Sequence, residues 1–163
     1  MYALTPEELL GFCSEEHQRW HKFFQSNPQA LDIPTDIART TSVRELVLHI
    51  ALVELRYSER LLSKEVTQYE GIPTDNVDRL FGIAKQAEDN FRAFFKMATE
   101  SDWKEVLTFP TRSAGTLKAS KRKMFVHSLL HGMRHWAQLS TLLRQRGLPQ
   151  EWQHDFLMST VIE

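Results

Sequence analysis

The spacing of apolar residues constrains the fold of this chain more than any other feature of its sequence. In four stretches, apolar side chains recur at intervals of three and four residues, which is the period of one face of an α-helix. These stretches begin near residues 5, 42, 75 and 118 and end near residues 26, 70, 100 and 146. Alternating apolar and polar residues, which indicate strands, are scarce. The pattern therefore predicts four long helices.

Residues that favour helix starts stand at the borders of these stretches. Thr5, which precedes a proline, can cap the first helix. Ser42, with Glu45 three residues later, forms the capping-box pattern at the start of the second. Thr74 or Asp75 is the expected cap of the third helix. These signals support the helix borders that the apolar spacing predicts.

The end of the chain and the connection before the last helix have their own patterns. Gly147 followed by Pro149 terminates the last helix. Residues 103–117 include a proline and a glycine, which predict an irregular connection that can contain a short extended piece. The tail carries Trp152 and Phe156 and is too apolar to remain in water, so it is expected to pack on the bundle or on a partner. We predict an all-α fold: one four-helix-bundle domain over residues 1–163, with a long connection before the last helix and a packed C-terminal tail.

Composition and charge exclude several classes of partner. The chain of 163 residues has 20 basic and 21 acidic side chains and a formal net charge of -1, so its charge gives no sign of binding to nucleic acid or to an anionic membrane. The short basic run at residues 118–123 is expected to be a solvated helix start. No apolar run approaches the roughly 20 residues needed to span a bilayer. We therefore expect neither nucleic acid nor a membrane as a partner.

The single cysteine and the N-terminal residues indicate the compartment. Cys13 has no second cysteine with which to form an intramolecular disulfide, which favours a reducing environment. The first twelve residues lack the basic stretch and apolar run of a signal peptide. A cytoplasmic location is the resulting expectation.

Three histidines lie on one line of the last predicted helix. His127, His131 and His135 recur every fourth residue and span roughly 80° of one face, and Gln138 falls inside that arc. Two imidazoles four residues apart can bind one ion, whereas the third would stay outside or support them. Hydrogen-bonded histidines in the core, and acid–base catalysis without a metal, are the alternatives. A metal site needs a further ligand from another helix.

The second predicted helix offers that ligand. His49 lies among Leu, Val and Ile, where an unpaired imidazole is costly to bury. Arg56 and Tyr57, seven and eight residues after His49, are candidates to line the site. Tyr57 is roughly 80° from His49 around an ideal helix and is a better pocket candidate than Glu54. Glu54, roughly 140° away, is not expected at the site.

The remaining histidines are not expected to bind the metal, and the absence of other metal motifs indicates which kind of ion the site would take. His17 and His21 stand among charged residues and are expected on a solvated face, and His154 has no assigned role. The Glu-x-x-His motif of di-iron bundles occurs once, at Glu151 in the tail, and His-Glu-x-x-His is absent from the sequence. An all-imidazole ligand set favours zinc, nickel or another transition metal over magnesium or calcium.

These features resemble the DinB/YfiT-like superfamily of four-helix-bundle metalloproteins. The resemblance rests on His49 within ELVLHIALVELRYSERLL and on HSLLHGMRHWAQLSTLLRQRGLP in the last helix. The last helix of the family carries two metal-binding histidines four residues apart, the second followed by Arg-Gly-Gln. Here His135 is followed by Trp136, Ala137 and Gln138. The resemblance thus implies His49, His131 and His135 as metal ligands.

The resemblance also implies what surrounds the metal and what the site does. His127, Gln138 and Tyr57 become pocket or supporting residues. The expected cofactor is a divalent metal, often zinc or nickel, with positions open to water, substrate or a low-molecular-weight thiol. Characterised relatives include thiol-dependent transferases and isomerases, others are described as metal-dependent hydrolases, and dimers are common.

We therefore expect a homodimeric, metal-dependent enzyme of the transferase or hydrolase type that activates a thiol or water and acts on a small molecule. Two alternatives remain open at this point. One is a non-catalytic metal-binding or stress-related bundle, whose ion mainly stabilises the fold. The other is a helical interaction module whose histidines bind nothing.

Overall fold

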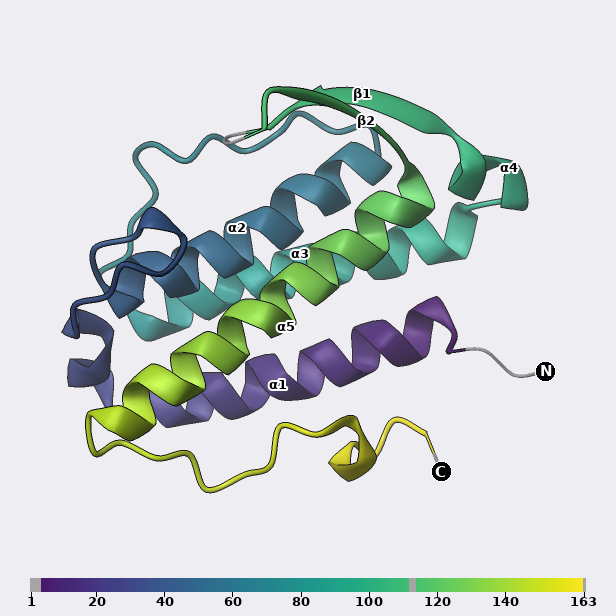
Figure 1. Cartoon of the computed structure of the whole chain (residues 1–163). Helices are drawn as coiled ribbons and strands as arrows, with labels where there is room; N and C mark the ends of the chain where they lie inside the picture. Colours follow the sequence, from purple (N-terminus) through teal and green to yellow (C-terminus); the bar gives the residue numbers. More distant parts are fainter. Residues whose placement is uncertain (1–3, 112–113, 163) are drawn as a thin grey trace.

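The computed structural model describes residues 4–111 and 114–162 and shows a bundle of four long helices (Figure 1). Residues 1–3, 112–113 and 163 lie outside the described parts. The four helices are α1 (Pro6–Ser26), α2 (Val43–Leu61), α3 (Val77–Met97) and α5 (Lys121–Gln145). The predicted all-α bundle is confirmed.

Side-chain caps fix the starts of the helices where the local sequence supplies them. The Thr5 hydroxyl accepts a hydrogen bond from the Glu8 amide at 3.2 Å, and the Glu8 carboxylate accepts one from the Thr5 amide at 2.7 Å. Ser42 caps α2 by accepting from the Glu45 amide at 3.3 Å. These bonds satisfy amide groups that a helix start otherwise leaves without partners.

The segment between α2 and α3 is longer than predicted. Helix α2 ends at Leu61, whereas the apolar spacing predicted that it continues to about residue 70. The Glu59 carboxylate accepts hydrogen bonds from the Thr67 amide at 2.9 Å and the Thr67 hydroxyl at 2.6 Å, which holds the following chain against the helix end. Helix α3 is capped by Asn76, one or two residues after the predicted position.

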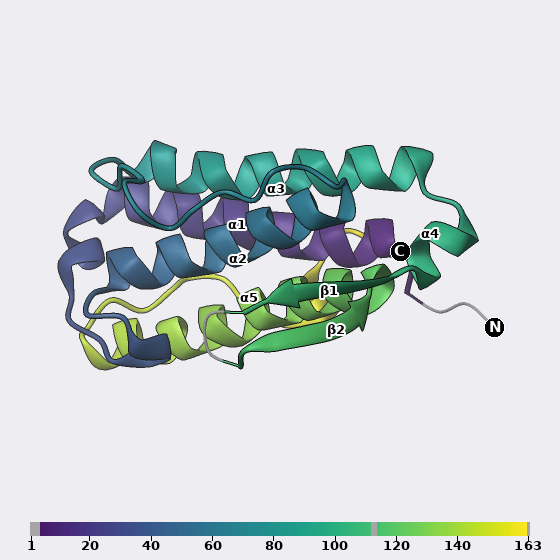
Figure 2. The same cartoon turned by 90° about the horizontal axis from the view of Figure 1, so that it is seen from above.

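A short antiparallel hairpin precedes the last helix. Helix α4 (Glu100–Lys104) leads into β1 (Val106–Pro110), which pairs with β2 (Thr116–Ser120). Figure 2 shows the hairpin along the side of the bundle formed by α2 and α5. The predicted irregular connection thus contains two strands, and residues 112 and 113 within it lie outside the described parts.

The hairpin also displaces the start of α5. Residues 118–120 pair with β1, so α5 begins at Lys121 instead of Lys118, and Ser120 caps it by accepting from the Lys123 amide at 3.2 Å. Lys121 itself is buried and lies 2.8 Å from the Glu105 carboxylate. The prediction that the whole basic run is solvated is therefore wrong at this residue.

Aromatic side chains fill much of the core between the helices. The rings of Trp20 and Trp136 stack at 5.1 Å between centroids and join α1 to α5. Phe91 and Phe125 meet edge to face at 5.2 Å and join α3 to α5 nearer the hairpin. All four side chains are buried. Burial of large apolar side chains is the main stabilising contribution in such a bundle, at about 1.5–3 kcal/mol each.

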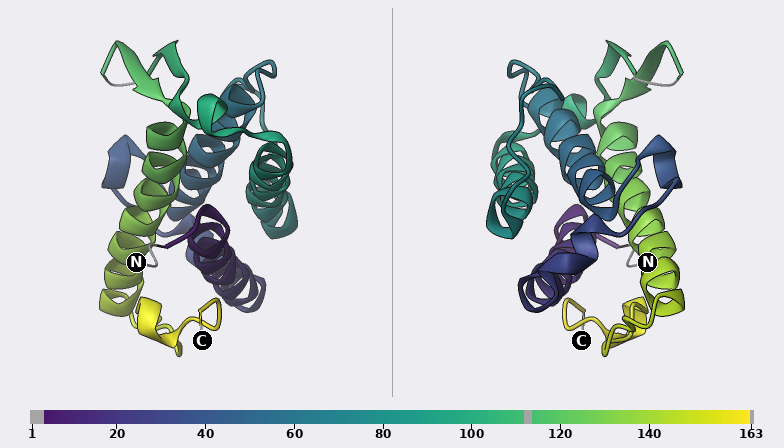
Figure 3. Two further views of the ribbon diagram at one scale, coloured as in Figure 1. Left: turned by 90° about the vertical axis from the view of Figure 1, so that its right-hand side faces the viewer. Right: turned by 90° about the vertical axis from the view of Figure 1, so that its left-hand side faces the viewer.

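The C-terminal tail runs back along α1 and α5, as the end views of Figure 3 show. The Trp152 ring meets Trp20 at 5.1 Å, and His154 Nδ1 lies 2.8 Å from the Glu16 carboxylate. The prediction that the tail is packed is confirmed, and the bundle is the surface that it covers.

Each of the four long helices has one face that is buried in the bundle and another that is exposed. Among residues 4–111 and 114–162, no helix combines the length and the apolar composition needed to cross a membrane.

Helices α2 and α5 approach each other closely at Gly132. A Cβ atom added there would lie 2.5 Å from Glu54 Oε1 and 3.4 Å from Ile50 Cγ2. Glu54 is 2% exposed, and its carboxylate lies 3.3 Å from Nε2 of His17 on α1. Gly132 therefore leaves the space in which a buried carboxylate can join three helices.

Replacing Gly132 by alanine tests this packing. We expect Gly132→Ala to lower the free energy of unfolding by about 1–3 kcal/mol, because the added methyl group displaces the buried Glu54 carboxylate. Gly82→Ala is the matched control: Gly82 lies inside α3, and a Cβ there meets nothing within 4 Å. The control should gain about 0.5–1 kcal/mol from the better helix propensity of alanine. Urea unfolding measures the stability of both variants. An increase in the free energy of unfolding for Gly132→Ala as well as for Gly82→Ala would contradict the assigned packing.

Candidate metal centre

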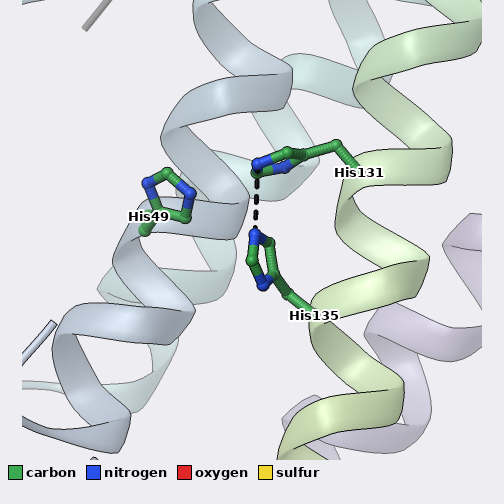
Figure 4. A group of neighbouring side chains, drawn as sticks. All are labelled: His49, His131 and His135. Atoms are coloured by element: carbon green, nitrogen blue, oxygen red, sulfur yellow. Dashed lines mark hydrogen bonds between the residues drawn. The ribbon is translucent and has the colours of Figure 1, made fainter. Parts of the chain in front are cut away.

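Three imidazoles converge between α2 and α5 (Figure 4). His49 comes from α2, and His131 and His135 come from successive turns of α5. One ring nitrogen from each residue lies within 4.8 Å of the other two. In the parts of the chain that the structure describes, no other group of three His, Cys, Asp or Glu side chains meets this criterion.

The two histidines of α5 already have nearly the spacing of ligands to one ion. His131 Nε2 and His135 Nε2 are 3.1 Å apart. Zinc–nitrogen bonds of about 2.0–2.1 Å in a tetrahedral arrangement place neighbouring ligand nitrogens about 3.3 Å apart. The His49 ring lies opposite, with its centroid 5.0 Å from that of His131 and 5.3 Å from that of His135. The donor set and its spacing fit a divalent transition metal.

Gln138 fixes the orientation of the most buried of these rings. Its side-chain oxygen lies 2.7 Å from His135 Nδ1, so that nitrogen carries the proton and donates. The guanidinium of Arg134 lies 3.3 Å from His135 Nε2 and can only donate to it. Both contacts leave the lone pair of His135 on Nε2, the atom that faces His131. Such outer hydrogen bonds orient the imidazole ligands of metal sites.

The surroundings keep the imidazoles of α5 uncharged. Burial lowers the pKa of His131 to about 3, together with the repulsion that protonated His135 and His49 would exert on a charged His131. Burial also lowers the pKa of His135 and that of His127. Neutral imidazole is the form that binds a metal ion, so these histidines are in the ligating form at neutral pH.

A cavity of about 300 Å³ opens beside His49 and His131. Tyr57 and His127 line it, with their rings 5.6 Å apart, and the ring of His127 lies 5.8 Å from that of His131. The structure thus brings both of these predicted pocket residues to the same space as two of the predicted ligands. Gln138 contacts the Nδ1 side of the His135 ring and is not among the residues that line this cavity.

Other residues that line the cavity were not singled out in the sequence. Arg60 of α2, Arg134 of α5 and Phe109 of the hairpin all contribute to its wall. Arg56, the residue just before Tyr57, was a candidate from the sequence and also lines the cavity. A signal for the two arginines of α2 exists, because positions 7 and 11 residues after His49 fall within roughly 20° of it around an ideal helix. Phe109 has no such signal, because strand pairing brings it to the site.

The structure corrects the prediction for the first histidine pair. His17 is not on a solvated face: its side chain is 13% exposed and lies 3.3 Å from Glu54 Oε1. Its charged neighbour Glu16 is itself buried and accepts from His154 of the tail at 2.8 Å. His21 is half-buried and lies 2.7 Å from Asp78 at the surface. The difference arises because the tail covers Glu16, the Glu54 side chain of α2 reaches His17, and α3 lies beside His21.

Trp136 and Ala137, which replace the Arg and Gly of the family pattern, point away from the three histidines. Trp136 is 2% exposed and stacks on Trp20 of α1, on the side of α5 that faces the core. Ala137 is exposed. The retained Gln138 is the residue of this trio that contacts a predicted ligand.

A known protein family matches this chain. The family model described as the DinB family matches residues 3–159. The match spans nearly the whole chain, so the chain belongs to the DinB family. None of the curated proteins matches it.

The pair of His17 and Glu54 predicts a pH dependence of stability. Burial disfavours the charged form of His17, but the carboxylates of Glu54, Glu88 and Glu16, with Glu54 foremost, together outweigh this effect and raise the pKa of His17 above its ordinary 6.5. The stabilising contribution is therefore fully present below the unfolded-state pKa and is lost as the pH rises through the higher folded-state pKa. We expect the stability difference between the wild type and His17→Gln to shrink from about pH 6 to about pH 9. Urea unfolding of chelator-treated protein measures it, and a difference that grows with pH would contradict the ion pair.

Proposed function

We propose that this member of the DinB family is a divalent-metal-dependent enzyme in which His49, His131 and His135 hold the ion. The observation that carries the proposal is the convergence of three ring nitrogens within 4.8 Å beside a cavity that reaches two of them. Zinc or nickel is the proposed ion, because all three ligands are imidazoles.

Three protein ligands are typical of catalytic sites, whereas structural zinc sites are closed by four. Among the described residues, the group that converges here has three members and includes no carboxylate or thiolate. The cavity beside His49 and His131 is large enough for a small molecule. This arrangement favours an enzyme over the alternative of a non-catalytic metal-binding or stress-related bundle.

When bound, a divalent ion in such a site lowers the pKa of a thiol or a water molecule and so makes it nucleophilic at neutral pH. The side chains at the cavity suit proton transfer to and from the reactants. Burial lowers the pKa of His127, so its imidazole is a neutral proton acceptor. Burial raises the pKa of Tyr57, although Arg60 and Arg56 oppose this, so its phenol hydroxyl stays protonated and can donate a hydrogen bond.

The proposed reaction is transfer to a low-molecular-weight thiol or hydrolysis of a small-molecule substrate. Both reactions use the same three ligands and the same cavity, and they differ in which nucleophile enters it. A homodimer and a cytoplasmic location, expected from the family resemblance and from the single Cys13, remain predictions.

Metal content tests the proposal most directly. We expect wild-type protein reconstituted with Zn²⁺ and then dialysed to retain one ion per chain, and His49→Ala and His131→Ala to retain almost none, because two imidazoles hold a transition metal far more weakly than three. His21→Ala, which removes a half-buried histidine of α1 outside the site, should retain the ion. Elemental analysis measures the stoichiometry. A wild-type protein that holds no stoichiometric metal after reconstitution would overturn the proposal.

The same preparations separate the two nucleophiles. In Co²⁺-substituted protein, a thiolate that reaches the ion produces a charge-transfer absorption band, which water does not. A band that appears with 2-mercaptoethanol and is lost in His49→Ala favours the thiol-dependent reaction. Its absence in metal-loaded protein leaves hydrolysis.

The hydrogen bond from His135 to Gln138 gives a second prediction. We expect Gln138→Ala to weaken Zn²⁺ binding by roughly tenfold, since loss of such a partner typically costs ten- to hundredfold in affinity and water can partly replace an exposed amide. Gln145→Ala is the matched control, because Gln145 is also exposed and lies two turns further along α5. Competition with a chromophoric chelator measures both affinities, and equal losses at the two positions would contradict the assigned role.

A further inference from the structure

The cavity beside the three histidines is strongly basic. Arg56 and Arg60 from α2 and Arg134 from α5 line it, and no Asp or Glu of the described residues does. The chain as a whole has 20 basic and 21 acidic side chains, so this concentration of positive charge is local. Clefts lined by charge of one sign attract ligands of the opposite sign.

Two of these arginines lack the partners that comparable arginines have. Four arginines of the described residues are half-buried: Arg19, Arg44, Arg56 and Arg60. Arg19 pairs with Glu16 at 2.9 Å, and Arg44 pairs with Asp32 at 2.8 Å. Among the ion pairs within residues 4–111 and 114–162, none includes Arg56 or Arg60.

Neighbouring groups hold the guanidinium of Arg60 in place without neutralising it. It lies 5.5 Å from the centroid of the Phe109 ring and 5.8 Å from that of Tyr57. One of its nitrogens donates to the backbone oxygen of Arg56 at 3.0 Å. A guanidinium has five N–H donors, so most of them are available to a ligand.

The guanidinium of Arg56 is held in a similar way. It lies 4.9 Å from the Tyr69 ring centroid, and it donates to the Thr67 backbone oxygen. Burial lowers the pKa of Arg60, and the nearby positive charge of Arg56 lowers it further. An anion between them would relieve this repulsion.

We propose that the cavity binds a small molecule with a carboxylate or phosphate group, which Arg60 and Arg56 hold by charge-assisted hydrogen bonds. Planar guanidinium groups match the geometry of both anions. The apolar part of the ligand lies against Phe109 and Tyr57, and the opposite end faces His49 and His131. The last step, which places the reacting end at the metal, rests on the proposed function; the binding of the anion does not.

The neighbouring cavity helps to locate the anion. It has a volume of about 490 Å³ and shares five residues with the first, namely His49, Arg56, Tyr69, Pro110 and Thr111. Its own lining adds one cation, Arg39, and the carboxylates of Glu45 and Glu70. These carboxylates disfavour an anion on that side. On the Arg60 side, no Asp or Glu of the described residues lines the cavity, so this is the proposed position of the anion.

Titration with benzoate, phenylphosphonate and neutral benzamide tests the inference. We expect one of the two anions to bind the wild type at least tenfold more tightly than benzamide, which has nearly the shape of benzoate but no charge. Arg60→Gln and Arg56→Gln should each weaken anion binding by about ten- to hundredfold, and Arg60→Lys by less, because it keeps the charge. Arg144→Gln, at an exposed position of the last turn of α5, is the control and should bind like the wild type. The preferred anion identifies the group that the site recognises.

The titrations are made with metal-free protein, with Zn²⁺-loaded protein and with His131→Ala, so that an anion bound only to the metal is recognised. Anion binding that depends on Arg60 and persists without metal supports the inference, even if the zinc experiment fails. Anion binding that requires the metal and is unchanged in Arg60→Gln and Arg56→Gln overturns it, while the metal proposal stands. Equal affinity for benzoate, phenylphosphonate and benzamide also overturns it. Circular dichroism checks folding, and Arg56→Gln decides the outcome if Arg60→Gln is unfolded.

Discussion

The buried carboxylate of Glu54 is the constraint on which the arrangement of the helices depends. A charge in the interior is costly unless it is paired, and His17 of α1 supplies the pair at 3.3 Å. Gly132 of α5 leaves room for the same carboxylate. Three helices are thereby fixed in register around one side chain. His131 directly precedes Gly132, so the register that accommodates Glu54 also sets His131 opposite His49.

Local signals predicted the fold well, and signals that depend on distant partners did not. The caps at Thr5 and Ser42 are formed by residues within four positions of each other, so the sequence alone locates those helix starts. The start of α5 was misplaced because residues 118–120 pair with β1, and no local pattern reports that partner. His17 was expected in solvent because its neighbours are charged, yet Glu16 is buried under the tail, more than a hundred residues away in the chain.

In the candidate site, too, local sequence signals predicted some features, and others depend on residues distant in the chain. The four-residue spacing of His131 and His135 predicts that they share a face, and an isolated His49 among apolar residues predicts that it needs a partner. Their convergence depends on how α2 and α5 pack, which the family resemblance implied and the structure shows. Arg60 follows from helical geometry once His49 is chosen as the reference, whereas the place of Phe109 follows only from the hairpin.

The metal ligands stand on core helices, whereas one wall of the cavity stands on the hairpin at the surface. This difference affects how such proteins can diversify. The three histidines stand on helices whose other faces form the core, so a change near them disturbs the stability of the whole bundle. One wall of the cavity comes instead from the hairpin, where Phe109 and Pro110 of β1, Leu117 of β2, and Thr111 and Ala114 between the strands line it. Most residues of the two strands are exposed or half-buried. Mutations in the hairpin can therefore alter which molecule enters without loosening the helices. The scaffold can stay constant over evolution while the preferred substrate drifts.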